Sequence, residues 1–177
     1  MIKYGVFLGK FSKVWHNGHQ SIVDKIREDG LEPIILIGSA QYSNTPACPL
    51  HIQDRMKMIK LVNPDLPMYT LEDKDDWELW VKTLVDSIKL VVTDNLDEVV
   101  IYVHNKPEDL MDFTYKDTEY RNEYYSKVFE VEGLNVKELP LSNINIRGTS
   151  VHEDLEGNKE FLDPKVYNYL KDLHAKN

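Results

Sequence analysis

The chain alternates short apolar runs with amphipathic stretches, and this alternation constrains the fold more than any other feature. Apolar runs at residues 2–8 and 33–37 each stop at a glycine and lead into a polar loop. Apolar residues at helical spacing follow over residues 20–28 and 51–62. Strands that alternate with helices of this length pair in parallel through right-handed crossovers, so the sequence predicts an α/β fold with a parallel sheet.

The same alternation continues through the middle of the chain and then weakens. Strands are predicted at residues 66–71 and 98–103, with a helix over 76–90 between them. Residues 114–125 are charged and rich in tyrosine, and we predict a helix there. Residues 128–139 predict one or two short strands around Gly133.

The last part of the chain predicts a loop and two helices. Residues 141–148 form the loop, which enters a short helix at Thr149. A terminal helix is predicted from Asp163-Pro164, with an apolar face made by Val166, Tyr169, Leu170 and Leu173. The architecture is a small doubly wound parallel sheet, in which ligands bind at the C-terminal ends of the strands.

Composition excludes several classes of protein. A length of 177 residues with 42% hydrophobic content suits one domain. The formal charge of -9 disfavours nucleic-acid binding, because an acidic surface repels phosphate backbones. No apolar run approaches the ~18 residues of a membrane span, and the N-terminus does not read as a signal peptide. A single cysteine, Cys48, excludes an internal disulfide, so we expect a reducing, cytoplasmic location.

The segment His16-Asn17-Gly18-His19 carries the clearest chemical signal. It opens the first predicted helix, where two histidines three residues apart can point the same way. Gly18 lets a ligand approach the backbone, and the free N–H groups of a helix N-terminus favour an anion. One histidine alone would read as a surface residue. The whole combination after a buried strand predicts a phosphate site.

This HNGH segment resembles the H-x-G-H signature of the nucleotidylyltransferase superfamily, whose members share a Rossmann-like sheet. Other segments are similar to the archaeal type of nicotinamide mononucleotide (NMN) adenylyltransferase within that superfamily. They are GSAQYS at 38–43, similar to G-S-A-Q-x-S; DRMKMI at 54–59, similar to E-R-x-x-M-I; GTSV at 148–151, similar to G-T-x-[IV]; and FLDPKV at 161–166, similar to the closing helix. The resemblance spans nearly the whole chain. It implies a single nucleotidylyltransferase domain, 1–177, in which residues 149–177 complete the nucleotide site.

The resemblance implies adenylyl transfer from ATP to NMN, giving NAD and pyrophosphate. Positioning and charge stabilisation would supply the rate, because the attacking phosphate is already ionised. His16 and His19 would donate hydrogen bonds to phosphate oxygens, while Lys10 and Arg147 would supply positive charge. Mg²⁺ would bridge the triphosphate and use few protein ligands, so no metal-binding residue is predicted.

The resemblance also implies two sets of binding residues. The ATP set is Gly9, Phe11, Gly18, Asn105, Gly148, Thr149 and Ser150; the NMN set is Ser39, Gln41, Asp73 and Trp80. In the second set Trp80 would stack on the nicotinamide ring and Asp73 would accept a hydrogen bond. The alternative for Trp80 is simple packing of its helix on the sheet.

The chain departs from the family pattern in its basic residues. The first loop is one residue longer than usual, with Lys10 in place of an arginine. His152 replaces the arginine that ends the last motif, and Arg147 replaces its serine. The GSAQ loop also lacks a basic residue that the family carries. Arg147 would have to reach the same phosphates from the other side of Gly148.

These departures leave other functions open. One is a nucleotidylyltransferase with a different donor such as CTP, or with a pantetheine, phosphocholine or nicotinate-type acceptor. Another is a nucleotide sensor without catalysis. The expected partners are ATP and NMN, with no nucleic acid and no membrane, and a homo-oligomer stays open because many members of the resembled family are oligomers.

Overall fold

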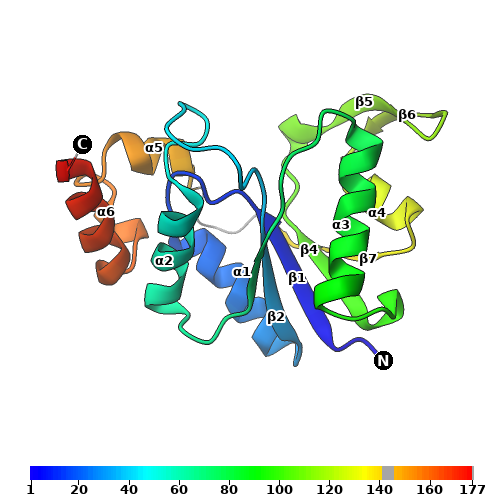
Figure 1. Ribbon diagram of the computed structural model, residues 1–177, viewed down its shortest axis with the longest axis horizontal. Helices are drawn as coiled ribbons and strands as arrows, with labels where there is room; N and C mark the ends of the chain where they lie inside the picture. The colour runs from blue at the N-terminus through cyan, green and yellow to red at the C-terminus, as the bar shows by residue number, and fades with distance from the viewer. Residues whose placement is uncertain (141–145, 177) are drawn as a thin grey trace.

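A five-stranded parallel sheet forms the centre of the computed structural model, which describes residues 1–140 and 146–176. Its order is β3-β2-β1-β4-β7 (Figure 1). The strands are β1 (Tyr4–Gly9), β2 (Glu32–Ile37), β3 (Met68–Thr70), β4 (Val99–Val103) and β7 (Asn135–Glu138). The order of connection reverses at β1, between β2 and β4. This arrangement confirms the predicted doubly wound, Rossmann-like sheet.

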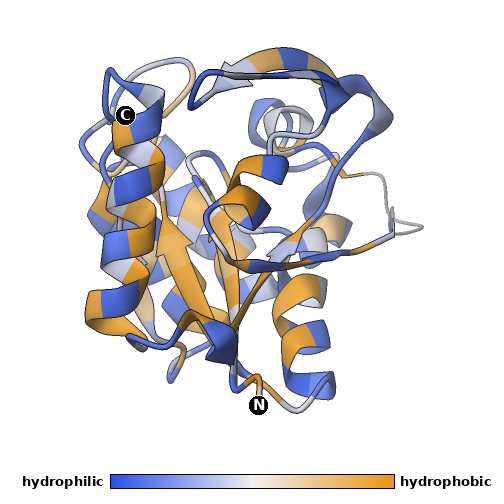
Figure 2. Cartoon of the chain, turned by 90° about the vertical axis from the view of Figure 1, so that its right-hand side faces the viewer, coloured by the Kyte–Doolittle hydropathy of each residue, from blue (hydrophilic) through white to orange (hydrophobic). Residues whose placement is uncertain are grey.

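Helices cover both faces of the sheet (Figure 1). One side carries α1 (Asn17–Glu28), α2 (Ile52–Val62), the short α5 (Gly148–Glu153) and α6 (Pro164–Lys176); the other carries α3 (Trp77–Val91) and α4 (Lys127–Val131). Short 3₁₀ turns lie at Leu96–Glu98, Pro107–Asp109 and Lys159–Phe161. Figure 2 shows the apolar strands enclosed between helices whose polar faces point outward. Two separate apolar clusters follow, one on each face.

The helix ends lie where the sequence places them. His51 and Asp76 cap α2 and α3, and each side chain accepts a hydrogen bond from a backbone N–H in the first turn. Gly30, with a φ of +80°, follows the end of α1 as predicted. The Leu31 N–H then donates to the Ile26 carbonyl, which closes the helix end. Among the described residues, no helix combines the length and hydropathy that crossing a bilayer would require.

The prediction of a helix over residues 114–125 is wrong. The chain forms an antiparallel hairpin there, with β5 (Met111–Tyr115) paired to β6 (Thr118–Glu123). Phe113 and Tyr115 are buried while the residues between and beside them are exposed, a two-residue alternation typical of a strand. Lys116 and Asp117 both have positive φ, as in the tight turns that suit the twist of a hairpin.

The prediction for residues 128–139 is half right. A strand, β7, does follow Gly133, but the residues before it form the short helix α4. Gly133 has a φ of +85°, and the Leu134 N–H donates to the Phe129 carbonyl. The glycine therefore ends a helix rather than joining two strands. Residues 141–145 of the predicted loop lie outside the described residues.

Candidate active site

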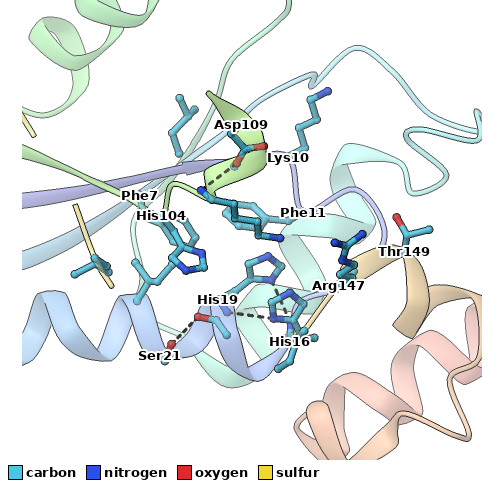
Figure 3. Close-up of a pocket in the computed structure, with 18 of the residues that line it drawn as sticks. Phe7, Lys10, Phe11, His16, His19, Ser21, His104, Asp109, Arg147 and Thr149 are labelled. Carbon is cyan, nitrogen blue, oxygen red and sulfur yellow. Dashed lines mark hydrogen bonds between the residues drawn. The ribbon is translucent and has the colours of Figure 1, made fainter. Parts of the chain in front are cut away.

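A pocket of about 900 Å³ opens at the C-terminal ends of β1 and β4, where the connection order of the sheet reverses (Figure 3). Its lining comes from residues 7–11 at the end of β1, residues 16–22 at the start of α1, residues 104–109 after β4, and residues 139–140 and 146–149. The residues from 104 onward lie far from the first two segments in the sequence. The pocket therefore occupies the place where ligands are expected in this class of sheet.

His16 and His19 form a stacked pair on the pocket wall. Their ring centroids lie 3.6 Å apart, and the ring planes differ by 12°. The backbone N–H of His19 donates to His16 Nδ1 at 3.3 Å, and the backbone N–H of His16 donates to His19 Nδ1 at 3.2 Å. The two residues thus cap α1 reciprocally, as a capping box does. Each Nδ1 is engaged as an acceptor, which leaves each Nε2 for another partner.

Both imidazoles are neutral at pH 7. Burial lowers the pKa of His16 to about 4, and the positive charge of Lys106 contributes. Burial, with the charge of His16, lowers the pKa of His19 well below its ordinary value. A neutral imidazole that accepts at Nδ1 carries its proton on Nε2. The site therefore presents two N–H donors without a net charge on either ring.

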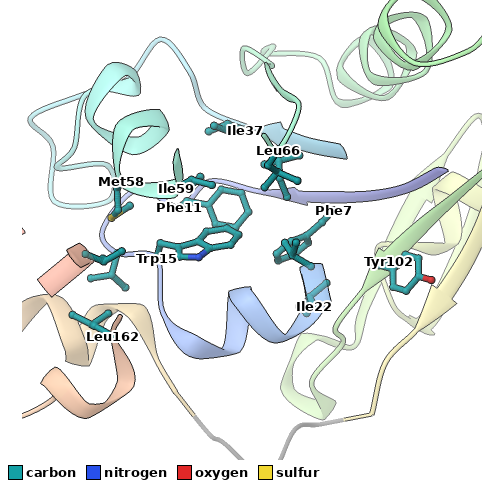
Figure 4. Close-up of a cluster of buried hydrophobic side chains, with 14 of the residues drawn as sticks. Phe7, Phe11, Trp15, Ile22, Ile37, Met58, Ile59, Leu66, Tyr102 and Leu162 are labelled. Carbon is teal, nitrogen blue, oxygen red and sulfur yellow. The ribbon is translucent and has the colours of Figure 1, made fainter. Parts of the chain in front are cut away.

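Aromatic rings pack against the imidazole of His19. Phe11 packs edge-on against His19 at 5.0 Å between centroids, and Trp15 lies 5.2 Å from the same imidazole. Figure 4 shows Phe11 and Trp15 beside Met58 and Ile59, which belong to α2. Phe11 is only 5% exposed but lines the pocket. Phe11 therefore supports the imidazole of His19 and also forms part of the pocket wall, where the sequence predicts ATP.

Two glycines predicted at the site are required by close packing. A Cβ on Gly18 would lie 2.8 Å from His16 Cε1, so any larger residue would displace that imidazole. A Cβ on Gly9 would lie 2.6 Å from the ring of Phe11. Both glycines line the pocket. The structure thus adds a reason for Gly18 that the sequence did not supply: a side chain at this position would move the imidazole of His16.

Three cationic residues line the pocket: Lys10, Lys106 and Arg147. Arg147 lies at the start of α5 and pairs with Glu108 at 3.8 Å between Nη2 and Oε1. Lys10 is exposed, and its side chain extends away from the imidazoles (Figure 3). The sequence assigned no role to Lys106. The feature of the sequence that could have identified Lys106 as a site residue is its place directly after the fourth strand, in the loop 104–107.

The start of α5 closes the pocket from the opposite end of the chain. Gly148 and Thr149 line the pocket, whereas Ser150 is not among its lining residues. Lys13 Nζ donates to Thr149 Oγ1 at 2.8 Å, a contact that joins the first loop to residues 136 positions later. Asn17 Nδ2 donates to the carbonyl of Glu160 at 3.2 Å. The two regions predicted to enclose the nucleotide therefore do lie together.

Arg55 has a structural role beside the site that the sequence did not predict. Its side chain is 0% exposed and donates to five backbone carbonyls. The acceptors are Lys10 in the loop after β1, Gly38, Ser39 and Tyr42 in the loop after β2, and Leu50 before α2. Arg55 thus fixes two loops at the pocket end of the sheet to each other. The sequence shows an arginine in the segment DRMKMI, but it does not show that this arginine is buried.

Three of the four residues predicted for NMN, Ser39, Gln41 and Asp73, form a cluster of their own. Ser39 Oγ donates to Asp73 Oδ2 at 2.7 Å, and Gln41 exchanges hydrogen bonds with the backbone of Asp73. Trp80 is half-buried against the apolar cluster of its sheet face, with its ring centroid 6.0 Å from that of Tyr125. None of these four residues lines the main pocket.

Asn105, predicted for ATP, lines a smaller neighbouring cavity instead. Its Nδ2 donates to Ser126 Oγ at 3.2 Å. The cavity has a volume of about 240 Å³ and shares Phe7, Leu8 and His104 with the main pocket. Asn105 therefore faces a space that adjoins the main pocket through shared walls.

The chain is similar in sequence to known proteins. Over 81 residues the chain is 38% identical to the nicotinamide-nucleotide adenylyltransferase of Methanoculleus marisnigri, covering 44% of this chain and 48% of that protein. It is 25% identical to the enzyme of the same name from Haloarcula marismortui, covering 97% of this chain and 82% of that protein. The chain thus aligns with about half the length of the first relative.

Solved structures and family membership point the same way. The chain superposes on a bifunctional NMN adenylyltransferase/ADP ribose pyrophosphatase from Francisella tularensis with a TM-score of 0.74 and 20% identity, covering 97% of this chain and 49% of that one. This likeness shows the fold. Residues 6–133 match the family described as Cytidylyltransferase-like, which is most of the chain. With its parallel sheet and its paired histidines at the mouth of the first crossover, the chain belongs to the cytidylyltransferase-like family.

Proposed function

We propose that this chain transfers the adenylyl group of ATP to nicotinamide mononucleotide, giving NAD and pyrophosphate. The observation that carries the proposal is the neutral, stacked pair of His16 and His19, which directs two N–H donors into a pocket bounded by the start of α5. The names of the matched relatives from Methanoculleus marisnigri and Haloarcula marismortui support NMN as the acceptor.

The chemistry suits donors held rigidly in place. A phosphate oxygen of the acceptor attacks the α-phosphorus of ATP, and the bond from that phosphorus to the β-phosphate oxygen breaks. Negative charge is redistributed over the oxygens around the α-phosphorus and on the departing pyrophosphate. The Nε2–H groups of His16 and His19 stabilise this charge without reorganising, because backbone hydrogen bonds fix both rings. No proton has to be removed from the attacking group.

Magnesium would enter this reaction with ATP. Among the described residues, no three His, Cys, Asp or Glu side chains gather as a metal site. The pocket does hold the carboxylates of Glu108 and Asp109, which could contribute at most one or two ligands. This set fits an ion that keeps phosphate oxygens and water as its main ligands. When bound, it would neutralise charge on the triphosphate.

A product assay tests the proposal. The purified chain is incubated with Mg²⁺, ATP and NMN, and NAD and pyrophosphate are quantified by chromatography. CTP replaces ATP, and nicotinate mononucleotide replaces NMN, in parallel reactions. We expect NAD and pyrophosphate in equal amounts from ATP and NMN. Pyrophosphate from CTP alone, or tight binding of ATP with no pyrophosphate from either nucleotide, contradicts the proposal.

The variant His16→Asn tests the role of the imidazole. Asparagine is a good helix cap, so the variant keeps a cap for α1 but loses the imidazole Nε2–H that faces the pocket. We expect turnover to fall on the order of 100-fold with the fold retained.

A further inference from the structure

The three cations of the pocket differ in their counter-charges. Arg147 faces Glu108, and Lys10 is exposed with its side chain directed away from the imidazoles (Figure 3). Among residues 1–140 and 146–176, Lys106 forms no ion pair, although it is half-buried. A partly desolvated ammonium without a counter-charge favours the binding of an anion. Of the three pocket cations, Lys106 is therefore the one for which a bound anion would supply a missing counter-charge.

The backbone around Lys106 is fixed. The residue follows β4, which pairs with β1 in the middle of the sheet. Its N–H donates to Asp109 Oδ2 at 3.3 Å, and the Asp109 N–H donates to the Lys106 carbonyl at 2.8 Å. Pro107 restricts the next backbone step. The carboxylate of Asp109 thus accepts a hydrogen bond from the backbone of the loop. The Lys106 side chain lines the pocket, where its ammonium can bind a ligand.

Lys106 also lines the same pocket as His16 and His19. Its positive charge contributes to the lowered pKa of His16. A positive charge near enough to act on an imidazole also attracts an anion bound to that imidazole. Any phosphate that accepts from His16 Nε2 therefore lies within the field of Lys106.

We propose that Lys106 is a catalytic residue that binds the phosphate held by His16 and His19 and stabilises the negative charge that develops there during transfer. The proposal rests on the proposed function for its reaction, but the binding of a polyphosphate needs only the pocket. Lys106 supplies the positive charge, and the neutral imidazoles supply directed hydrogen bonds. The two contributions are complementary, because an ammonium is a point charge with little directionality.

The test compares Lys106→Met with Lys106→Arg and with Lys82→Met. Lys82 is an exposed residue in the middle of α3 and lines neither pocket, so its substitution makes the same change of charge elsewhere. We expect Lys106→Met to lower kcat on the order of 100-fold and to weaken ATP binding about tenfold or more. Lys106→Arg should recover most of the lost ATP affinity. Lys82→Met should behave like the original chain.

A second readout does not depend on catalysis. The pKa of His16 is measured by NMR titration in each variant, and inorganic tripolyphosphate is titrated into each at pH 7. Lys106→Met should raise the pKa of His16 and weaken tripolyphosphate binding about tenfold or more. Lys82→Met should change neither quantity. Unchanged tripolyphosphate binding in Lys106→Met overturns the proposal.

The two experiments separate this proposal from the proposed function. If the chain binds tripolyphosphate through Lys106 but makes no NAD, the adenylyl transfer is wrong and the phosphate site stands. If NAD is made at the same rate by Lys106→Met and Lys82→Met, the adenylyl transfer stands and the role of Lys106 is wrong.

Discussion

The imidazoles of His16 and His19 lie face to face, 3.6 Å apart, and each accepts a hydrogen bond from the backbone N–H of the other residue. The two side chains thus cap the helix and, in the proposed function, also donate hydrogen bonds to phosphate. The cap uses Nδ1 of each ring, which leaves Nε2 of each ring for a ligand of the pocket that both residues line. This division of labour requires both rings to stay neutral, because a protonated Nδ1 could no longer accept.

Stability should therefore depend on pH in a defined direction. The pKa of His16 is about 4 in the folded chain against an ordinary value of 6.5, so the unfolded chain binds more protons between these values. The lowered pKa of His16 therefore contributes on the order of 3 kcal/mol to the free energy of unfolding. This contribution is complete above pH 6.5 and is lost as the pH falls towards 4. Urea unfolding at a series of pH values measures it.

His16→Asn is the matched variant for this prediction, since asparagine caps the helix and does not titrate. Its stability should fall less steeply over the same range. NMR at pH 7 should show both rings of the unmodified chain with the proton on Nε2. An imidazolium at either position at that pH contradicts the assignment.

Gly18→Ala should separate activity from stability. Alanine is the better helix residue by about 0.5–1 kcal/mol, but a displaced His16 weakens the cap of α1 by about the same amount, so the melting temperature should change by no more than a few degrees. The added Cβ would lie 2.8 Å from His16 Cε1 and must displace the imidazole. We expect kcat to fall about tenfold or more, since a misplaced donor loses transition-state stabilisation. Asp24→Ala, an exposed change on α1, is the control, and full activity in Gly18→Ala would argue against a fixed His16.

Arg55 should be essential to stability as well as to the site. Arg55→Met removes five hydrogen bonds to backbone carbonyls, and we expect a loss of at least about 3 kcal/mol in the free energy of unfolding. Arg55→Lys should lie between the two, because lysine keeps the charge but not the planar fork. Arg121→Met, which removes an exposed pair with Glu119, should cost no more than about 1 kcal/mol. Denaturant titration measures all three.

The hairpin turn offers a stabilising substitution. Asp117 has a φ of 63°, a conformation that glycine adopts without strain. Asp117→Gly should raise the melting temperature by a few degrees. Gly133→Ala, at a φ of +85°, should lower it by a similar amount. A shift in the opposite direction for either variant would show that its backbone conformation differs from the one described.

The sheet could be predicted from sequence because each strand is a short apolar run and each helix has one apolar face. The hairpin could not, because its alternation is carried by Phe113, Tyr115 and Tyr120 among charged residues, and tyrosine reads as neither clearly apolar nor clearly polar. Gly133 was ambiguous for a different reason. A glycine with positive φ ends a helix as readily as it turns between strands.

The site divides in the same way. The local spacing of His16, Gly18 and His19 predicts that they lie together at the start of a helix, and the structure places all three on the pocket wall. The roles of Arg55 and Lys106 depend on tertiary structure, the first through complete burial and the second through its place in the same pocket as His16. A pattern of residues along the chain contains neither fact. Contacts between distant segments, such as Lys13 with Thr149, are visible only once the fold brings them together.

The most direct measurement follows the α-phosphorus of ATP. With ATP labelled at that atom, unlabelled NMN and Mg²⁺, our account predicts that the label appears in NAD and none in pyrophosphate, and that His16→Asn slows this transfer on the order of 100-fold. Label that stays in ATP under these conditions, or transfer that proceeds at the same rate without the His16 imidazole, would contradict it.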